Sequence, residues 1–399
     1  MRIALIKETK TPVDNRVALS PKQVADLNRR FPQHKIVVQA SDIRAFSDEE
    51  YRAEGVEIVH DVEDCDILFG IKEAKIESLI ANKQYFFFGH VAKMQEYNRP
   101  LLQALMKKHI TFCDYEYLVD DNNIRVCAFG WWAGVVGVYY TLCGYGLRTG
   151  LFALPKPDLS FTKEKLLNIL KGVKLPAVKL LVTGNGRVSK GAQYVLDAIG
   201  AKKLSVSEFI NVDKVDDLSY CVADVDLLAK HKFGKAFEMH DFIEHPDDYE
   251  SDFHKWSQAT DILVCAHFWD NRAPVYLDVE ELRSTRIKMI GDISCDIMGS
   301  VKSTLRSSTH DQPYYDYNPI SGQEEKCFSS GNNISVMAVD TCPNALARDT
   351  SEYFGEMLVE HVFNSLLEEK HSDVIERATI LKEGHLTKRF NYLENYSRS

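Results

Sequence analysis

The first third of the chain carries basic residues, one histidine and one acid at points where apolar stretches end. These residues are Lys10, Arg16, Lys72, His90, Lys93, Glu116 and Arg125. Ligands in open α/β sheets bind beyond the carboxyl ends of the strands, so we expect these side chains to ring one crevice. Arginine grips a carboxylate through two hydrogen bonds, and lysine acts as a point charge. Several converging cations therefore indicate a substrate with several carboxylates, although a single lysine or arginine is more often a solvated surface charge.

A glycine-rich turn joins an apolar stretch to a helical one near the middle of the chain. Gly184 permits a tight turn, and Gly186 lets the backbone approach a pyrophosphate at the helix N-terminus. Ser189 stands where the strict fingerprint has its third glycine, and Gly191 follows slightly later. The strand, turn and helix context predicts a dinucleotide site, and the alternative is a glycine turn that leads into an ordinary helix.

The choice between NAD and NADP stays open. An acid about 20 residues beyond the first glycine binds a ribose 2′-OH in sites of this kind. Counting on from Gly184 reaches Glu208, which favours NAD. The same stretch holds residues that could accept a 2′-phosphate, namely Lys202, Lys203, Ser205 and Ser207.

The elements that must position these residues alternate between strands and helices. Apolar strand-like stretches lie at residues 3–6, 35–39, 66–71, 85–88 and 110–113, and a second series lies at 178–183, 204–206, 261–266 and 287–290. Apolar residues at three- and four-residue steps separate the strands of the first series, so helices cover parallel sheets. We expect two α/β domains, and the helical last sixty residues, which follow the stretch 335–340, to dock on the first of them.

Composition excludes some partners. The 399 residues carry 48 Lys and Arg against 58 Asp and Glu, a net charge of −10 that argues against nucleic acid as a partner.

Nine cysteines without a C-x-x-C pair indicate reduced thiols. The uncharged stretch 127–147 has the length of a membrane span, but its five glycines favour a buried helix. Met1 leads directly into a strand, which predicts a cytoplasmic protein.

Two further features of the sequence could bind a metal or a ligand. Four histidines lie among acids between His231 and His254, but their spacing does not suit a metal site, so we expect a helical insertion and no metal. Asp292 and Asp340 each end an apolar run, where a loop can meet a ligand.

The strings around these residues resemble a known family. They include FFGHVAKMQE (87–96), DYEYLVD (114–120), RVCAFGWWAG (125–134), TGNGRVSKGAQ (183–193), DISCD (292–296) and TSEYFGEML (350–358). Together they resemble lysine-ketoglutarate reductase, the lysine-forming saccharopine dehydrogenase, within the alanine dehydrogenase-like superfamily. They span nearly the whole chain and are much more specific than the glycine turn alone.

The resemblance implies a fold and a reaction. The fold would be α/β, with two Rossmann-like domains whose parallel sheets are separated by a cleft. Residues 1–132 and 338–399 would bind the substrate, and residues 133–337 would bind the dinucleotide. The reaction would join the ε-amine of lysine to 2-oxoglutarate as an imine and reduce it with an NAD(P) cofactor to saccharopine. The second half of the bifunctional lysine-degrading enzyme is absent from this chain.

The resemblance also assigns roles to single residues. Lys72 and His90 match the acid–base pair, Arg16, Lys93 and Arg125 match positions that bind substrate carboxylates, and Glu116 matches an acid that tunes the site. The cofactor would contact Gly184, Gly186, Arg187, Val188, Glu208 and Asp340. A buried lysine with a lowered pKa and a histidine are suited to these proton transfers.

The sequence is also compatible with two other functions. A related opine-type or amino-acid dehydrogenase, similar to alanine dehydrogenase, would act on another amine and oxo acid. A non-catalytic NAD(P)-binding sensor would have no need of Lys72, His90 and Arg125. The sequence leaves open whether the protein is a monomer or a homodimer.

Overall fold

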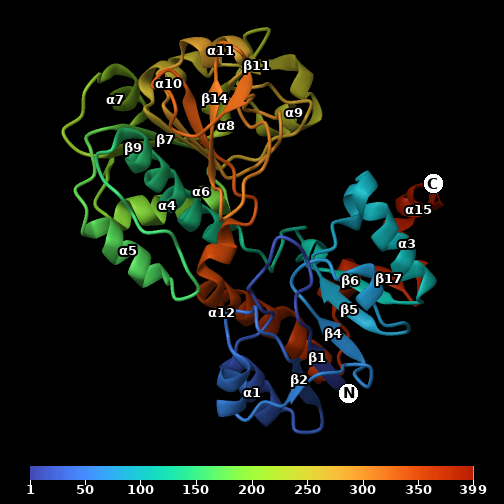
Figure 1. Ribbon diagram of the computed structural model, residues 1–399. Helices are drawn as coiled ribbons and strands as arrows, with labels where there is room; N and C mark the ends of the chain where they lie inside the picture. Colours follow the sequence, from blue (N-terminus) through green and yellow to red (C-terminus); the bar gives the residue numbers. More distant parts are fainter. Residues whose placement is uncertain (399) are drawn as a thin grey trace. The chain divides into compact units, whose positions relative to one another are not determined.

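The computed structural model describes residues 1–398 and divides the chain into two compact units (Figure 1). The first unit combines Met1–Phe129 with the chain from Ala347 onward, and the second is Gly130–Leu346. The first predicted boundary, after residue 132, lies three residues beyond this division, and the second, after residue 337, lies nine residues before it. The reason is packing: helix α4 starts at Gly130, and Cys342 and Leu346 belong to the core of the second unit. Asp340 consequently lies in the second unit.

The first unit is built on an eight-stranded sheet in the order β18-β17-β6-β5-β4-β1-β2-β3. The strands are β1 (Arg2–Leu5), β2 (Lys35–Gln39), β3 (Ile58–Val59), β4 (Ile67–Phe69), β5 (Gln84–Phe87), β6 (Thr111–Asp114), β17 (Thr379–Lys382) and β18 (His385–Leu386). Neighbours from β3 to β6 are parallel, whereas β17 pairs antiparallel with β6. The carboxyl ends of β1, β4, β5 and β6 therefore share one edge.

Helices from both ends of the chain cover this sheet. They are α1 (Pro21–Arg30), α2 (Asp48–Ala53), α3 (Arg99–Lys107), α12 (Ala347–Leu358), α13 (Asn364–Leu367), α14 (Asp373–Ala378) and α15 (Glu394–Arg398). A π-helical stretch, η7 (Val359–Phe363), joins α12 to α13, and short 3-10 helices are η1 (Ile76–Ser78), η2 (Val91–Lys93), η3 (Glu96–Asn98), η4 (Tyr115–Tyr117) and η8 (Lys388–Leu393).

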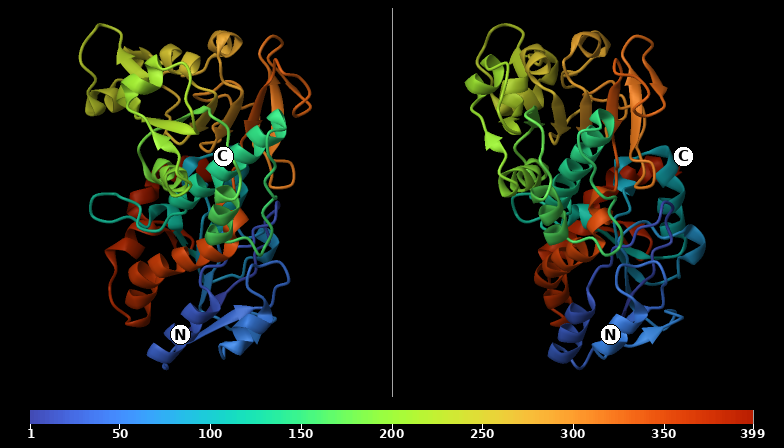
Figure 2. Two further views of the ribbon diagram at one scale, coloured as in Figure 1. Left: turned by 90° about the vertical axis from the view of Figure 1, so that its left-hand side faces the viewer. Right: turned by 60° about the vertical axis from the view of Figure 1, so that its left-hand side comes forward.

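The last part of the chain completes the first unit, as Figures 1 and 2 show by the red segments beside the blue ones. Gln23 of α1 donates a hydrogen bond to the carbonyl of Glu352 in α12, and Phe354 is buried in the same core as Val24. We expected this part to dock there without strands, but it also adds β17 and β18 to the sheet edge.

The second unit holds another eight-stranded sheet, in the order β15-β14-β16-β13-β12-β7-β9-β8. The strands are β7 (Lys179–Thr183), β8 (Lys202–Lys203), β9 (Ser219–Ala223), β12 (Ile262–Cys265), β13 (Met289–Asp292), β14 (Tyr314–Asn318), β15 (Gln323–Glu325) and β16 (Ile334–Met337). In this order, neighbouring strands from β16 to β8 are parallel. Strands β14 and β15 extend the sheet beyond β16 in antiparallel pairing. The prediction of an α/β fold with two largely parallel sheets is confirmed.

Helices of the second unit are α4 (Gly130–Thr149), α5 (Lys163–Lys171), α6 (Arg187–Ala198), α7 (Val206–Asn211), α8 (Val225–Leu228), α9 (Met239–Glu244), α10 (His254–Ala259) and α11 (Val279–Ser284), with 3-10 turns η5 (Pro246–Asp248) and η6 (Cys342–Leu346). Strands β10 (Ala229–His231) and β11 (Tyr249–Ser251) form a separate hairpin around α9. The predicted strand at 204–206 instead leads into α7, and β9 was not predicted.

Helices α4 and α6 touch through glycines. A Cβ on Gly134 would lie 1.9 Å from the carbonyl oxygen of Val188, and one on Gly191 would lie 1.8 Å from that of Trp131. Only glycine permits this approach of two backbones. The uncharged stretch 127–147 thus lies mostly in a buried helix, as predicted, and within residues 1–398 no helix is long and apolar enough to cross a membrane.

This contact yields a stability prediction. We expect Gly191→Ala to lower the unfolding free energy of the second unit by about 3 kcal/mol or more, because the new methyl group must force the helices apart. Gly331→Ala is the matched control, since nothing lies within 4 Å of its added Cβ. Calorimetric unfolding of both variants provides the measurement, and equal transitions would show that the helices can separate without cost.

Candidate active site

Four loops of the first unit bring the predicted cations and acids together. Lys72 follows β4, His90 follows β5, Glu116 lies just after β6 and Arg16 follows β1. Because these strands lie side by side with parallel neighbours, their carboxyl ends gather the four side chains at one edge.

His90 is held by a carboxylate that it shares with a lysine. Nδ1 of His90 lies 2.8 Å from one oxygen of Glu73, and Nζ of Lys10 donates to the other oxygen at 2.7 Å. Burial opposes ionisation of Glu73, but the hydrogen bonds from His90 and Lys10 prevail and lower the pKa of Glu73 to about 2. Glu73 is thus an anion at neutral pH that orients the imidazole and leaves Nε2 for proton transfer.

Lys72 lies in a largely buried position among other cations. Burial, followed by the positive charges of Arg16 and Lys10, lowers the pKa of Lys72. Both effects favour the neutral amine, which can accept a proton. Arg16 itself is buried and forms two hydrogen bonds with Asp14, at 2.9 Å and 2.5 Å. Burial opposes the ionisation of Asp14, but the Arg16 charge lowers its pKa.

The turn that carries His90 is strained and tightly built. His90 has a left-handed backbone with φ of 54°, and a Cβ on the preceding Gly89 would lie 2.5 Å from the ring of Phe112. Asp114 accepts hydrogen bonds from the backbone N–H groups of Gly89 at 3.2 Å and His90 at 3.0 Å. Burial raises the pKa of Asp114 to about 6. The carboxylate at the end of β6 therefore fixes the turn at the end of β5.

Glu116 joins the remaining two cations. Its Oε1 lies 3.1 Å from Nζ of Lys93 and 3.2 Å from Nη2 of Arg125. Although burial opposes ionisation, Lys93, His90 and Arg125 lower the pKa of Glu116. Lys93 and Arg125 are 47% and 40% exposed, so both can reach a substrate in solution.

The structure thus brings together all the predicted substrate-site residues of the first unit. Sequence reasoning missed Glu8, Asp14 and Glu73, although each lies within two residues of a basic residue that it had singled out. That proximity was the available signal. The predicted group and the missed acids together make a site that can bind carboxylates and transfer protons.

The glycine turn of the second unit has the predicted form. Gly184 has φ of 81°, and its Cβ would lie 2.7 Å from the Cα of His267. Gly186 precedes α6, and nothing lies within 4 Å of its added Cβ, so the helix N-terminus is open to a ligand. Ser189, which replaces the third glycine, is buried, and Gly191 makes the close helix contact instead.

A cavity of about 660 Å³ adjoins this turn. Gly184, Gly186, Arg187 and Val188 line it. Apolar side chains form other walls of the cavity, namely Met239, Ile243 and Phe268. These three residues are 47%, 61% and 88% exposed. An open helix N-terminus beside an apolar slot fits a pyrophosphate with an attached flat base, so these residues fit a dinucleotide.

Two predicted cofactor residues lie outside this cavity. Glu208 accepts hydrogen bonds from the N–H and hydroxyl of Ser205 in a capping box of α7 and does not line the cavity. A count of about 20 residues from Gly184 reaches α7, whereas the strand beside β7 is β9 rather than β8. Asp224, directly after β9, lines the cavity instead. Asp340 is exposed after β16 and does not line the cavity.

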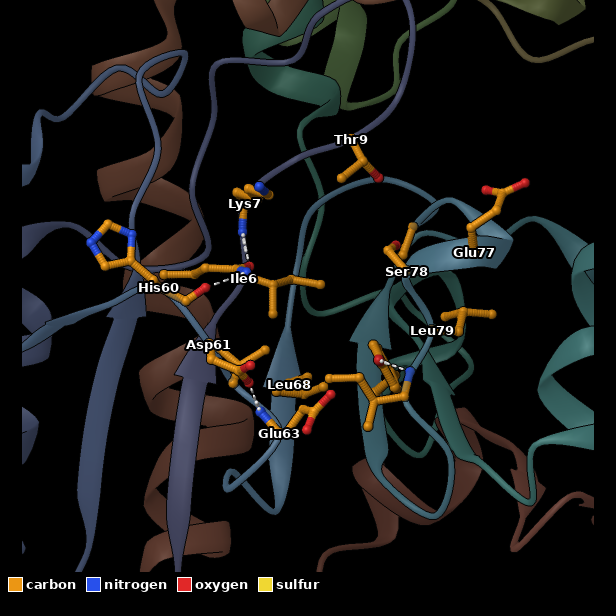
Figure 3. A pocket seen from close by; sticks show the side chains of 15 residues that line it. Ile6, Lys7, Thr9, His60, Asp61, Glu63, Leu68, Glu77, Ser78 and Leu79 are labelled. Carbon is orange, nitrogen blue, oxygen red and sulfur yellow. Dashed lines mark hydrogen bonds between the residues drawn. The ribbon is translucent and has the colours of Figure 1, made fainter.

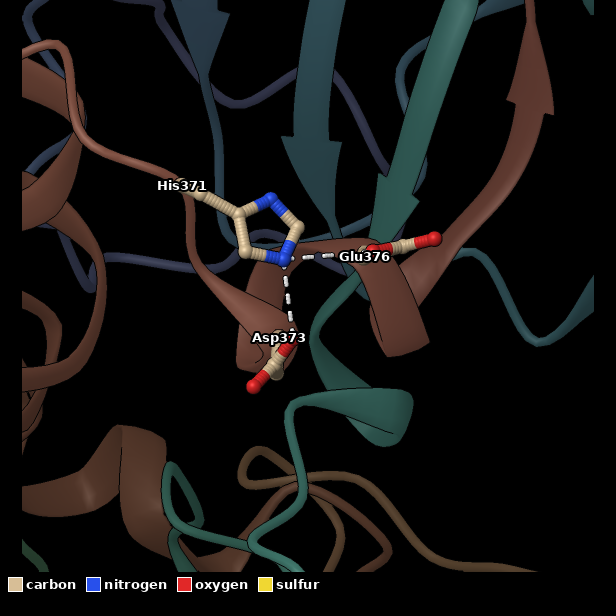
Figure 4. Close-up of side chains that lie close together, drawn as sticks. All are labelled: His371, Asp373 and Glu376. Carbon is tan, nitrogen blue, oxygen red and sulfur yellow. Dashed lines mark hydrogen bonds and ion pairs between the residues drawn. The ribbon is translucent and has the colours of Figure 1, made fainter.

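Other side-chain groups lie apart from this site. His371, Asp373 and Glu376 lie close together at α14, all exposed, with the histidine 2.8 Å from Asp373 (Figure 4). These contacts are ordinary ion pairs between exposed side chains and do not indicate a metal site.

Figure 3 shows a cavity of the first unit with a volume of about 370 Å³, lined by residues such as Lys7, His60 and Glu77. None of the predicted site residues lines it.

Comparison with known proteins places this fold and site in context. Residues 4–136 match the family model "Alanine dehydrogenase/PNT, N-terminal domain". A solved L-alanine dehydrogenase structure aligns over 99% of both chains with a TM-score of 0.65 and 17% identity. The fold is therefore that of an alanine dehydrogenase-like protein with two Rossmann-type units.

The relatives with similar sequences include enzymes named for lysine metabolism. Alpha-aminoadipic semialdehyde synthase of Arabidopsis thaliana is 29% identical across 100% of this chain and 42% of its own length, and the mitochondrial mouse protein of that name is 27% identical across 100% and 48%. The chain thus spans about half the length of these relatives. A saccharopine dehydrogenase [NAD(+), L-lysine-forming] of Yarrowia lipolytica is 24% identical over 97% of this chain and 98% of its own. The resemblance inferred from the sequence is confirmed.

The pKa of Glu73 predicts how stability depends on pH. Its pKa falls from an ordinary 4.5 to about 2, so its ionised form contributes about 3 kcal/mol to folding above pH 5. This contribution should halve near pH 3 and vanish near pH 2. Urea unfolding of Glu73→Gln against the parent chain across this range measures it. Glu96→Gln, at an 88% exposed position, is the control, and a constant difference between Glu73→Gln and the parent would contradict the assignment.

Proposed function

We propose that this chain catalyses the NAD(P)-dependent condensation of L-lysine with 2-oxoglutarate to saccharopine, and the reverse oxidation. The observation that carries the proposal is the cluster in the first unit: Lys72 with a lowered pKa and a Glu73-bound His90 stand among Arg16, Lys93 and Arg125. The names of the relatives support the choice of substrates.

The charges of the cluster suit these substrates. Saccharopine has three carboxylates, and Arg16, Lys93 and Arg125 are three cations at the edge of one sheet. Glu116 forms ion pairs with Lys93 and Arg125 and so keeps the two cations close together before substrate binds. Because Lys93 and Arg125 are 47% and 40% exposed, each can bind a substrate carboxylate while it keeps its contact with Glu116.

Two proton transfers determine what the acid–base pair must do. The ε-amine of lysine must lose a proton before it attacks the oxo carbon, and the resulting hydroxyl must gain one to leave as water. Lys72 can accept the first proton because its neighbours favour the neutral amine. His90, oriented through Nδ1 by Glu73, can donate the second. The nicotinamide of a bound cofactor would supply the hydride that reduces the imine.

Substrate tests distinguish the proposal from related activities. Oxidation of NADH and NADPH is followed by absorbance with 2-oxoglutarate plus lysine, ornithine, ammonia or no amine, and with pyruvate plus ammonia. We expect oxidation that depends on lysine and 2-oxoglutarate together. Turnover with pyruvate and ammonia would instead establish an alanine dehydrogenase-type activity, and no turnover with any pair would favour a binding protein.

Substitutions separate proton transfer from carboxylate binding. We expect Lys72→Met to lower kcat at least 100-fold, because it removes the proton acceptor. Lys93→Met should raise the KM for 2-oxoglutarate roughly tenfold with a smaller change in kcat, because it removes one exposed cation. Steady-state kinetics with lysine in excess measures both. Equal losses of kcat would remove the case for Lys72 as the acid–base group.

We further propose that the chain prefers NAD, because of Asp224. A carboxylate at the end of the strand beside the glycine turn binds both ribose hydroxyls and repels a 2′-phosphate. An adjoining groove is lined by Asp224, Lys190 and Lys203, and the two lysines hydrogen-bond to neutral amides of Asn185 and Gln193. Removal of the Asp224 charge would therefore leave two cations for a phosphate.

The corresponding variant is Asp224→Ser. We expect the ratio of kcat/KM for NADH over NADPH to fall at least tenfold relative to the parent chain. Glu208→Gln is the control, because Glu208 caps α7 outside the cavity. If Glu208→Gln changed the ratio and Asp224→Ser did not, Glu208 and not Asp224 would be the acid that binds the ribose.

A further inference from the structure

A partly buried acid of the first unit binds the backbone at Lys72 and has no part in the mechanism above. Glu8 follows β1, and both of its carboxylate oxygens accept backbone hydrogen bonds from the loop after β4. The N–H of Ile71 donates to Oε1 at 2.6 Å, and the N–H of Lys72 donates to Oε2 at 2.9 Å. One carboxylate therefore binds the backbone of the residue whose amine is proposed to accept the proton.

The loop after β4 is built to admit this carboxylate. A Cβ on Gly70 would lie 3.3 Å from Oε1 of Glu8, so a larger residue would crowd it. On the other side, the hydroxyl of Tyr115 donates to the carbonyl of Gly70 at 2.9 Å. The turn from Gly70 to Lys72 is thus held by two side chains, one that follows β1 and one that follows β6.

The charges around Glu8 connect its protonation to that of Lys72. Burial, followed by the charge of Asp14, raises the pKa of Glu8 to about 8, while Arg16 opposes the rise. Arg16, Lys10, Glu73 and Asp14 act on Lys72, and Tyr115 also interacts with Glu8. Above a pH of about 8 Glu8 is ionised, and its negative charge, bound to the backbone of Lys72, then favours the protonated amine. A neutral Lys72 leaves a net negative cluster unless Glu8 holds a proton.

We infer that Glu8 is a positioning residue: it fixes the loop that carries Lys72 and determines how tightly the Lys72 amine holds its proton. Its part in catalysis rests on the proposed function, but its effect on Lys72 does not. The amine of Lys72 should lose its proton at a lower pH when the Glu8 charge is absent, and its placement should loosen when one of the two backbone hydrogen bonds is lost.

Chemical labelling tests the effect on Lys72 without any enzyme assay. Trace acetylation with acetic anhydride between pH 6 and pH 11, followed by mass spectrometry of the Lys72 peptide, gives the pH at which half of the amine is reactive. Exposed Lys171 of the second unit serves as the internal reference. We expect Glu8→Gln to lower the Lys72 midpoint by about half a pH unit or more, and Lys171 to stay unchanged.

Glu57→Gln is the matched control, because Glu57 is a half-exposed acid of the same unit paired with Arg2. An unchanged Lys72 midpoint in Glu8→Gln, or the same shift in Glu57→Gln, would overturn the inference. Should Glu8→Gln fail to fold, Gly70→Ala answers the same question, because its methyl group crowds the Glu8 carboxylate. It should also move the Lys72 midpoint, and an unmoved midpoint there would equally overturn the inference.

Kinetics then connects the position to catalysis. If the parent chain turns over lysine and 2-oxoglutarate, Glu8→Gln should lower kcat at least tenfold and shift the pH profile of kcat in the direction found by labelling, with KM for the cofactor unchanged. A shifted labelling midpoint in a chain without activity would defeat the proposed function alone. Normal kcat and an unchanged pH profile would defeat the role of Glu8.

Discussion

The site depends on one constraint: charged groups that are buried together must compensate each other. Glu8, Asp14, Arg16 and Lys72 lie largely out of water at the ends of two neighbouring strands, where an unpaired charge would cost several kcal/mol. Asp14 balances Arg16 by direct hydrogen bonds, and Glu8 binds the backbone that carries Lys72. The same rule fixes His90 through Glu73 and Lys10. The loops after β4 and β5 are thus each held by an acid that follows another strand.

Parallel strands make this arrangement possible. The carboxyl ends of β1, β4, β5 and β6 meet at one edge, so residues far apart in the chain become neighbours. Close backbone contacts add precision: Gly89 sits against Phe112, and Gly70 leaves room for Glu8. The second unit uses the same principle, because Gly191 lets α6 approach α4 and Gly184 turns against His267. Its cavity then combines the open N-terminus of α6 with apolar walls.

The sequence predicted the fold class and most of the first-unit site, because apolar stretches mark buried strands and the residues after them meet at the sheet edge. It did not predict Glu8, Asp14 or Glu73, since an acid next to a lysine or arginine usually forms a surface pair. The position of Glu208 outside the cavity has another cause. Counting along the chain assumes which strand lies beside β7, but the order β8-β9-β7 is a tertiary property, and β9 was missed. Asp224 therefore became visible only in the structure.

The most direct test of the proposed activity is the mass of the product formed from lysine, 2-oxoglutarate and reduced cofactor, with lysine carrying ¹⁵N at its ε-position. Reduction of an imine between the two substrates predicts a product with all the carbon and nitrogen atoms of both substrates, and therefore with the label. Its mass should equal that of the two substrates plus two hydrogens minus one water. One product molecule should form for each cofactor oxidised. Release of labelled ammonia, or formation of glutamate without carbon from lysine, would contradict the account.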